Sequence, residues 1–332
     1  MSKNNLKPTS KELFVNGAIM APMSDVNQPA FCRVLKDLGC KIIYTGLLTS
    51  HGLVHGNKNT FEIIKLLPDG VTMVGQIFGA EPEIMRDAAL ILEQSCKFSA
   101  IDINMGCPVP KVVKGNAGVG LMRDPELAGR IVKLVSEAVK LPVTVKMRSG
   151  WSSEEINCLE LAAICVDSGA AAVSLHPRTK VQAYHGKADW ELVARMKEEI
   201  SVPVIGSGDI CSPQEAISKM KKYGCDSVMI GRATRTDPTI LGRTSVLMQE
   251  GVEVKPPRRE ELLDIAIKHF RYHIDIEGPD RGVRSLRSHL AYYIKGMPGA
   301  ADIRNRIVHE SNSEMMIDML EAYADFVKNN EK

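Results

Sequence analysis

The 332-residue sequence lacks long apolar runs, paired cysteines and a marked excess of either charge. No stretch approaches the roughly 18 apolar residues that a membrane-spanning helix needs. The polar start, Met1 to Ser10, lacks the basic and apolar regions of a secretory signal. The net charge of +2 is too small to indicate a nucleic-acid partner by itself. We therefore expect a soluble, cytoplasmic protein without a membrane span.

The eight cysteines are spread singly, without the C-x-x-C pairs or nearby histidine clusters of zinc and iron–sulfur sites. We therefore predict no metal site. Cys40, Cys96, Cys165 and Cys225 lie in apolar surroundings, which favours small buried hydrophobic residues. Cys107 differs, because glycine and proline surround it in a loop.

Short apolar, β-branched segments alternate with segments of helical periodicity up to Ile230. The strand-like segments are Ala18–Met23, Lys41–Thr45, Thr72–Phe78, Ala100–Ile103, Val143–Met147, Ala171–Leu175, Val202–Ile205 and Asp226–Ile230. The helical segments include Glu83–Ser95, Pro125–Val139, Glu154–Asp167, Trp190–Ile200 and Pro213–Tyr223. This alternation indicates a parallel sheet, and eight units predict an α/β fold, a closed (β/α)8 TIM barrel.

The pattern changes near Gly251, where Lys255–Arg259 is typical of a linker and strand-like segments end. We predict a barrel over 1–250, a linker over 251–259 and an all-helical domain over 260–332. From Arg281 to Arg306 six basic residues stand against one acid. Apolar residues recur there at helical spacing and predict one buried stripe beside a basic exposed face: Val283, Leu286, Leu290, Tyr293 or Ile294, and Met297.

Cys107 follows the predicted strand at 100–103, at the end of the barrel where active sites are built. With an ordinary pKa of about 8.5, a thiol is protonated at neutral pH yet releases its proton easily. Cys107 therefore suits a general acid acting on a small planar ring. Asn104 lies on the same loop, three residues earlier.

Other predicted strand ends carry groups that suit a ligand. Glycine turns follow the last two strands, at Ser207–Asp209 and at Gly231–Arg232, and predict a phosphate site, with plain tight turns as the alternative. Lys146 in an apolar strand indicates a charge for an anionic ligand more than a structural lysine. Gln76 fits the edge of a pyrimidine-like ring, or a structural hydrogen bond equally well. His176 either caps its turn or, as we favour with Arg178 nearby, serves the site.

Eight segments occur in one order: APMSD, QIFG, DINMGCPVPK, GNAGVGLM, VKMRSGW, LHPRT, SGDI and MIGRA. In this order they resemble the tRNA-dihydrouridine synthase family, most closely its bacterial B-type branch. The resemblance covers Ala21 to about Arg243 and continues weakly through Arg284–Tyr293. The Asn-Met-Gly-Cys-Pro loop is the most specific of these segments.

The resemblance implies a flavoenzyme that uses FMN, with NADPH as reductant, to reduce the C5=C6 bond of uridines in tRNA. Hydride would pass from reduced FMN to C6, and Cys107 would protonate C5. The residues that would hold FMN or its phosphate are Pro22, Met23, Ser24, Gln76, Lys146, His176, Ser207, Gly208, Asp209, Gly231 and Arg232. Asn104 and Arg178 would hold the target uracil, and the basic helix, with Arg284, Arg287 and Lys295, would bind the tRNA.

Three positions depart from the family pattern. Ser207 stands where asparagine is usual, Ser288 replaces a usual lysine, and the strand ending at Tyr44–Leu47 lacks an acid common there. These departures bear on which RNA position is reduced more than on the reaction. Two alternatives stay open: an FMN barrel acting on a free pyrimidine, like dihydroorotate dehydrogenase, and a flavin-bearing RNA-binding protein without turnover. The sequence indicates no oligomeric partner.

Overall fold

The computed structural model describes residues 13–330 and has a closed barrel of parallel strands at its centre. Neighbouring strands follow the order β2-β1-β9-β8-β7-β6-β5-β4, and a β2–β4 pairing closes the ring. The eight strands of the ring are β1 Ala18–Met20, β2 Ile42–Tyr44, β4 Thr72–Phe78, β5 Ala100–Met105, β6 Val143–Arg148, β7 Ala172–His176, β8 Val204–Ser207 and β9 Ser227–Ile230. The predicted TIM barrel is therefore confirmed, with each predicted strand in its place.

One strand was not predicted. β3, Leu48–Thr49, pairs with the end of β4 at Ile77 and Phe78. Two residues are too few for a recognisable alternation of apolar and polar positions, so the sequence carries no signal for it.

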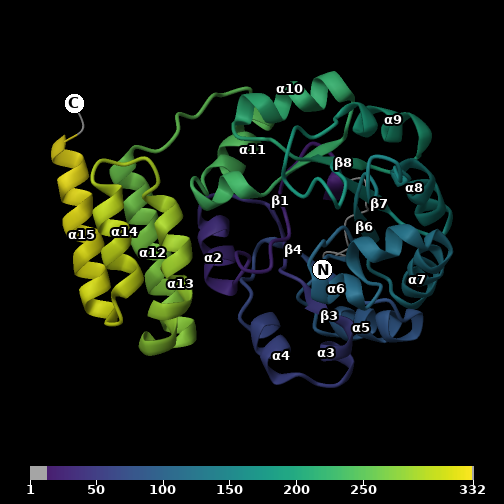
Figure 1. The fold of residues 1–332 in the computed structure, drawn as a ribbon, viewed down its shortest axis with the longest axis horizontal. Helices are drawn as coiled ribbons and strands as arrows, with labels where there is room; N and C mark the ends of the chain where they lie inside the picture. Colours follow the sequence, from purple (N-terminus) through teal and green to yellow (C-terminus); the bar gives the residue numbers. More distant parts are fainter. Residues whose placement is uncertain (1–12, 331–332) are drawn as a thin grey trace, which may run out of the picture.

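Helices surround the barrel, as Figure 1 shows. Asp124 and Ser212 accept hydrogen bonds from the first turns of α7 and α10, and proline opens both helices. The predicted helix at 154–167 begins at Cys158 instead, because Gly150 forms an antiparallel bridge with Ile156. The helices before the linker are α2 Pro29–Asp37, α3 Ser50–Val54, α4 Lys58–Lys65, α5 Pro82–Gln94, α6 Pro110–Lys114, α7 Pro125–Ala138, α8 Cys158–Asp167, α9 Glu191–Glu199, α10 Pro213–Tyr223 and α11 Ile240–Glu250, with 3-10 turns η1 Gly118–Arg123 and η2 Arg232–Arg235.

Alternate residues of each strand point into the barrel, and their character changes along the strands. At the amino ends they form an apolar cluster that includes Ile19, Ile42, Val74, Ala100, Ala172, Ile205 and Met229. Toward the carboxyl ends the same faces carry Gln76, Asp102, Asn104, Thr144, Lys146, Ser174, His176 and Ser207. The barrel therefore has an apolar floor and a polar mouth.

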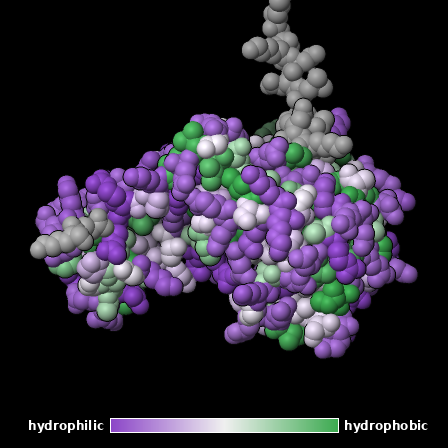
Figure 2. Space-filling view, turned by 90° about the horizontal axis from the view of Figure 1, so that it is seen from above, coloured by the Kyte–Doolittle hydropathy of each residue, from purple (hydrophilic) through white to green (hydrophobic). Residues whose placement is uncertain are grey.

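A helical bundle follows the barrel. Residues 251–258 contain no helix or strand, and the bundle then consists of α12 Arg259–Glu277, α13 Pro279–Tyr293, α14 Ala300–His309 and α15 Ser313–Asn330. It has its own hydrophobic core, and α12 packs against α2 of the barrel (Figure 1). Figure 2 shows the two parts as separate lobes with a notch between them. The predicted stripe on α13 is buried, including Val283, Leu286 and Leu290.

Cys40, Cys165 and Cys225 are buried as predicted, but Cys96 is exposed. The prediction for Cys96 was wrong because this residue lies in the turn after α5, with a positive φ of 56°, and not on the packed face of the helix.

Between residues 13 and 330, no helix is both long and apolar enough to cross a membrane.

Candidate active site

A cavity of about 550 Å³ opens at the carboxyl ends of the strands. Most of the residues expected to hold FMN line it: Pro22, Met23, Lys146, His176, Ser207, Gly208, Asp209, Gly231 and Arg232. Tyr292 and Lys295, at the end of α13 and just beyond it, line the cavity as well. The barrel mouth and the helical bundle therefore share one cavity. Two of the residues expected to hold FMN lie outside its lining, since Ser24 is exposed and Gln76 is fully buried below the mouth. Cys107, Asn104 and Arg178, expected to act on the uracil, are not among the lining residues either.

Cys107 lies half-buried just beyond β5, on a loop that Asn104 holds in place. The Asn104 Oδ1 accepts hydrogen bonds from the backbone N–H groups of Gly106, at 3.1 Å, and Cys107, at 2.9 Å. The Arg148 side chain donates to the carbonyl of Gly106, at 3.0 Å. Burial raises the pKa of the Cys107 thiol, although Arg148 and Lys146 lower it in part. The thiol therefore keeps its proton at neutral pH.

Below this loop, Gln76 is bonded to other side chains of the barrel interior. Its Nε2 donates to the Asp102 Oδ2 at 2.7 Å, and its Oε1 accepts from the Asn104 Nδ2 at 2.8 Å. The structure therefore gives Gln76 structural hydrogen bonds, and its contact with a ring edge stays a prediction.

Lys146 and His176 are half-buried in the cavity wall, on the neighbouring strands β6 and β7. Burial and the nearby Arg148 lower the pKa of Lys146 to about 8. Burial and the nearby Lys146 lower the pKa of His176 to about 2. At neutral pH the wall therefore carries a lysine cation beside a neutral imidazole, an arrangement that suits an anionic or electron-rich ligand.

The two glycine turns differ in how closely the protein packs against the glycine. Gly208 has a φ of +120°, and a Cβ there would lie 2.9 Å from that of Ala188, so the fold itself requires glycine. Gly231 has a negative φ, and its Cβ would meet Ala21 and Met23 only at ordinary contact distances of 3.4 and 3.6 Å. The protein around Gly231 therefore leaves room for a Cβ, whereas the protein around Gly208 does not.

Asp209 and Ser207 have bonds within the protein. The Ser207 hydroxyl donates to the carbonyl of Met229 at 3.1 Å. The Asp209 carboxylate accepts from the Ala188 N–H at 2.9 Å and lies near Arg178 and Arg232. Burial would raise the pKa of Asp209, but these donors outweigh it and hold the pKa below its usual value. Asp209 is therefore an anion that orients two arginines at the cavity.

Arg178 is buried, with 1% of its surface exposed, and most of its donors are bonded within the protein. Nε donates to the carbonyl of His185, while Nη2 donates to the carbonyl of Gly186 and to Asp209. Nη1 lies 3.4 Å from the His176 Nε2 and, within residues 13–330, is the guanidinium nitrogen without an oxygen partner. Arg178 therefore fixes the loop after β7, and its contact with a uracil stays a prediction that only Nη1 could fulfil.

The three basic residues expected to bind RNA lie in different environments. Lys295 is exposed at the cavity, and Arg284 is exposed on α13, where its Nε donates to the carbonyl of Asp280. Arg287 is half-buried and donates to the carbonyl of Glu310, so it ties α13 to the loop after α14. The expectation that Arg287 lies on the exposed face was wrong.

Sequence reasoning gave no role to several residues at this end of the barrel. Arg148 donates to the carbonyls of Thr179 and Ala183 besides that of Gly106, so it joins the loops after β5 and β7. The alternation of side chains along a strand indicates that Asp102 and Arg148 point into the barrel, because each lies two residues from another polar residue that does so, Asn104 on β5 and Lys146 on β6. No sequence pattern indicated a role for Arg235. Its guanidinium lies 3.6 Å from the ring centre of Tyr292, and this contact joins η2 to the bundle.

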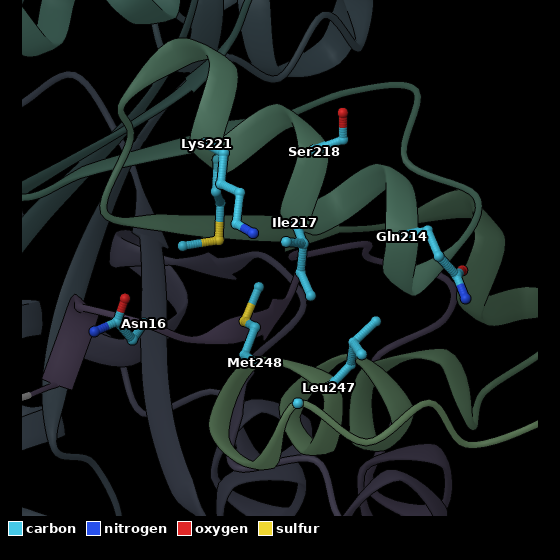
Figure 3. Close-up of a pocket in the computed structure, with 9 residues that line it drawn as sticks. Asn16, Gln214, Ile217, Ser218, Lys221, Leu247 and Met248 are labelled. Atoms are coloured by element: carbon cyan, nitrogen blue, oxygen red, sulfur yellow. The ribbon is translucent and has the colours of Figure 1, made fainter.

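A second hollow of about 710 Å³ lies between α10 and α11. Figure 3 shows Ile217 of α10 facing Leu247 and Met248 of α11 across it. Asn16, which precedes β1, places this hollow at the opposite end of the barrel from the polar mouth. None of the candidate site residues lines it, so we assign the chemistry to the mouth. Among the described residues, no group of three or more His, Cys, Asp or Glu side chains could hold a metal ion.

Comparisons with known proteins agree with the geometry of the mouth. Residues 19–329 match the family model described as dihydrouridine synthase. A protein of Rickettsia typhi named probable tRNA-dihydrouridine synthase is 35% identical over 290 residues, which cover 87% of this chain and 88% of that protein. A protein of Xanthomonas axonopodis pv. citri named tRNA-dihydrouridine synthase B is 34% identical over 310 residues, covering 92% of each.

A solved structure supports the fold alone. A morphinone reductase variant in complex with tetrahydroNAD aligns with a TM-score of 0.51 at 11% identity, covering 73% of this chain and 88% of that one. The family model spans both the barrel and the bundle, and the two relatives match over most of their length. This chain therefore belongs to the dihydrouridine synthase family of oxidoreductases.

Proposed function

We propose that this protein is a tRNA-dihydrouridine synthase that reduces the C5=C6 bond of specific uridines in tRNA, with FMN as its cofactor and NADPH as its reductant. One observation carries the proposal. A protonated thiol, Cys107, lies on a loop held by Asn104 of β5, and Asn104 is the register partner of Lys146 on β6, which lines the cavity shared by barrel and bundle. Because tRNA is the substrate in this proposal, we also propose the cytoplasm as its compartment.

The residues of the cavity fit FMN. The backbone at Gly208 and Gly231 would receive the phosphate, with Arg232 beside it as a cation. Pro22 and Met23 would pack against the ring, and Lys146 and His176 would lie along its polar edge. When bound, FMN would supply the hydride for C6 of the uracil.

A matched pair of variants tests this cradle. A Cβ at Gly231 meets no close protein contact but would lie where the phosphate is proposed to bind, so Gly231→Ala should lose affinity for FMN. Thermal unfolding of the apoprotein checks that the variant is folded. Gly115→Ala, outside the cavity lining and with its nearest protein contact at 3.6 Å, serves as the control. Unchanged FMN binding by Gly231→Ala in a fluorescence titration would remove Gly231 from the cofactor site.

The chain's own part in the chemistry is to hold and donate a proton. Burial raises the pKa of Cys107, so the thiol carries its proton when a substrate arrives. We propose that Cys107 gives this proton to C5 while the lysine cation of Lys146 stabilises developing negative charge. Asn104 and the Nη1 of Arg178 would orient the uracil.

A uridine within folded tRNA reaches such a mouth only if it leaves its stack. The bundle contributes Tyr292 and the exposed Lys295 to the rim of the cavity, and the exposed Arg284 lies on the same helix as Tyr292. We propose that these residues bind the RNA around the extracted nucleotide. A barrel acting on a free pyrimidine would not need them, which favours tRNA over that alternative.

The proposal is tested with purified full-length protein, FMN, NADPH and tRNA from a strain without dihydrouridine. Mass spectrometry should find dihydrouridine at defined positions, and free uridine or orotate should give no turnover. The alternative of a free-pyrimidine enzyme requires the reverse result. An RNA-binding protein without turnover would bind the tRNA and leave its uridines unchanged.

A further inference from the structure

Three neighbouring strands place polar side chains side by side beneath the mouth of the barrel. Gln76 on β4 is the register partner of Asp102 on β5, which is in turn the partner of Thr144 on β6. All three are fully buried. The Asp102 oxygens accept from Gln76 at 2.7 Å and from the Thr144 hydroxyl at 2.6 Å. The carboxylate of Asp102 is therefore bonded by neutral donors.

Hydrogen bonds run in one direction from Asp102 to the cysteine loop. A carboxylate only accepts, so Gln76 must present its Nε2 to Asp102 and its Oε1 to Asn104. Asn104 then donates through Nδ2, and its Oδ1 is free to accept the N–H groups of Gly106 and Cys107. Each amide has one correct orientation, and reversing either one would set two donors or two acceptors against each other.

This direction decides what Asn104 offers to a ligand. Its Oδ1 already accepts two backbone N–H groups, so the second hydrogen on Nδ2 is what remains. Lys146, the register partner of Asn104 on β6, also offers only donors. The two side chains therefore match the carbonyl oxygens of uracil and oppose the amino group of cytosine.

The carboxylate is not what stability alone would select. Burial raises the pKa of Asp102 to about 7, although Thr144, Gln76 and Lys146 each lower it. Since the pKa in the folded state lies above its ordinary value, the stability that Asp102 contributes is present at low pH and is lost as the pH rises toward 7. At pH 8 the carboxyl of Asp102 is mostly ionised and can only accept hydrogen bonds, so the tests are made at this pH.

We propose that Asp102 is a positioning residue: its ionised carboxylate, an obligate acceptor, fixes the direction of the Gln76–Asn104 amide chain, which holds the Cys107 loop and turns an N–H of Asn104 toward a ring carbonyl of the substrate. This inference rests on the proposed function, because it assigns the substrate of the same site. Asp102 touches neither cofactor nor substrate and acts through Asn104.

The test is Asp102→Asn, which keeps the size of the side chain but can also donate, so that Gln76 and Asn104 can reverse. We expect the folded protein to keep its melting temperature at pH 8, and kcat for uridine reduction to fall at least about tenfold. KM for tRNA should stay within about twofold, because Asp102 is fully buried and is not among the residues proposed to bind the RNA. Alkylation of Cys107 by iodoacetamide, followed on its own peptide by mass spectrometry, should become severalfold faster as the loop loosens.

A second variant restores the direction. In Asp102→Asn with Gln76→Glu the obligate acceptor moves to position 76, where it accepts from both neighbours, so Asn104 is again oriented as in the wild type. We expect alkylation of Cys107 to return to the wild-type rate in this double variant. If Asp102→Asn alone fails to fold, the double variant decides the matter by the same measurement.

The results separate this inference from the proposed function. Wild-type kcat and wild-type Cys107 alkylation in Asp102→Asn would overturn the role of Asp102, as would fast alkylation in the double variant. If the wild-type protein reduces no uridine in tRNA, the proposed function fails. The alkylation rates would still test whether Asp102 controls the loop.

Discussion

The Arg178 Nη2 lies 2.9 and 2.7 Å from the two oxygens of Asp209, which joins the loop after β7 to the turn after β8. Arg178 is almost completely buried, and Asp209 is one-third exposed. The pair places an oriented anion between two arginines beside the expected phosphate site. Arg178 therefore fixes the turn that we propose holds the cofactor phosphate.

Arg178→Met should loosen both loops and leave Asp209 without its buried partner. Breaking a buried pair costs about 3–5 kcal/mol, and we expect the lower end because Asp209 is partly hydrated. The checks are thermal unfolding and the flavin absorbance of the purified protein, with the exposed Arg195→Met as control. Normal stability together with normal flavin content would mean that the pair does not support the cradle.

Lys146 should give turnover an alkaline limit. Burial lowers the pKa of Lys146 to about 8, and its cationic form is the one that stabilises negative charge. Turnover should therefore fall as the pH rises through about 8. Lys146→Arg, which stays charged, should move this fall to higher pH even if its maximal rate is lower. The measurement is kcat against pH at saturating tRNA. An identical alkaline limit in both proteins would assign it to another group.

A histidine cluster at the barrel–bundle contact should make the protein sensitive to acid. The ring of Phe31 on α2 lies 5.2 Å from that of His269 and 4.7 Å from that of His289. Burial, with Arg235 and His273 nearby, lowers the pKa of His289 to about 3, and burial lowers the pKa of His269 as well. Both histidines are therefore neutral in the folded protein at neutral pH.

The sign of the effect follows from linkage. The folded-state pKa lies below the ordinary value of 6.5, so the stability is present above pH 6.5 and is lost as the pH falls below it. At pH 5 the loss is about 2 kcal/mol for His289. His289→Gln should lose less stability than the wild type between pH 7 and pH 5, measured by urea unfolding, and the exposed His309→Gln should not. Equal losses in all three proteins would refute this role.

Lys295 and Arg287 should separate RNA binding from folding. Lys295→Ala should weaken tRNA binding and reduce the slope of log affinity against log salt by about 0.7–0.9, the effect of one phosphate contact. Arg287→Ala should instead lower the melting temperature, because it removes the bond from α13 to the carbonyl of Glu310. The exposed Lys328→Ala is the control for both. A lower salt slope for Arg287→Ala alone would reverse the assignment.

The sequence indicates the barrel, and also which end of the barrel holds the site, because local patterns encode both. On β5, Asp102 and Asn104 alternate with Ile101 and Ile103, so the strand shows its polar inner face as well as its existence. Cys107 is likewise placed by the strand end that precedes it. These features depend on neighbours within a few residues.

The features that the sequence did not reveal depend on contacts between distant segments. Arg178 and Asp209 are 31 positions apart and meet only because β7 and β8 are neighbours. Arg287 shares the helical phase of a basic face, but the chain returns through α14 and places the carbonyl of Glu310 against it. Charge and periodicity cannot tell an arginine bonded within the protein from one that is free to bind RNA.

The most direct test of the central claim is a single-turnover measurement of dihydrouridine in tRNA, with reduced FMN-loaded protein, comparing wild type with Cys107→Ala. Both proteins should hold FMN and bind tRNA alike. The account predicts that the wild type forms dihydrouridine and that Cys107→Ala forms it at least about 10²-fold more slowly, for lack of the proton donor. Product formation by Cys107→Ala at the wild-type rate, or none by the wild type, would contradict it.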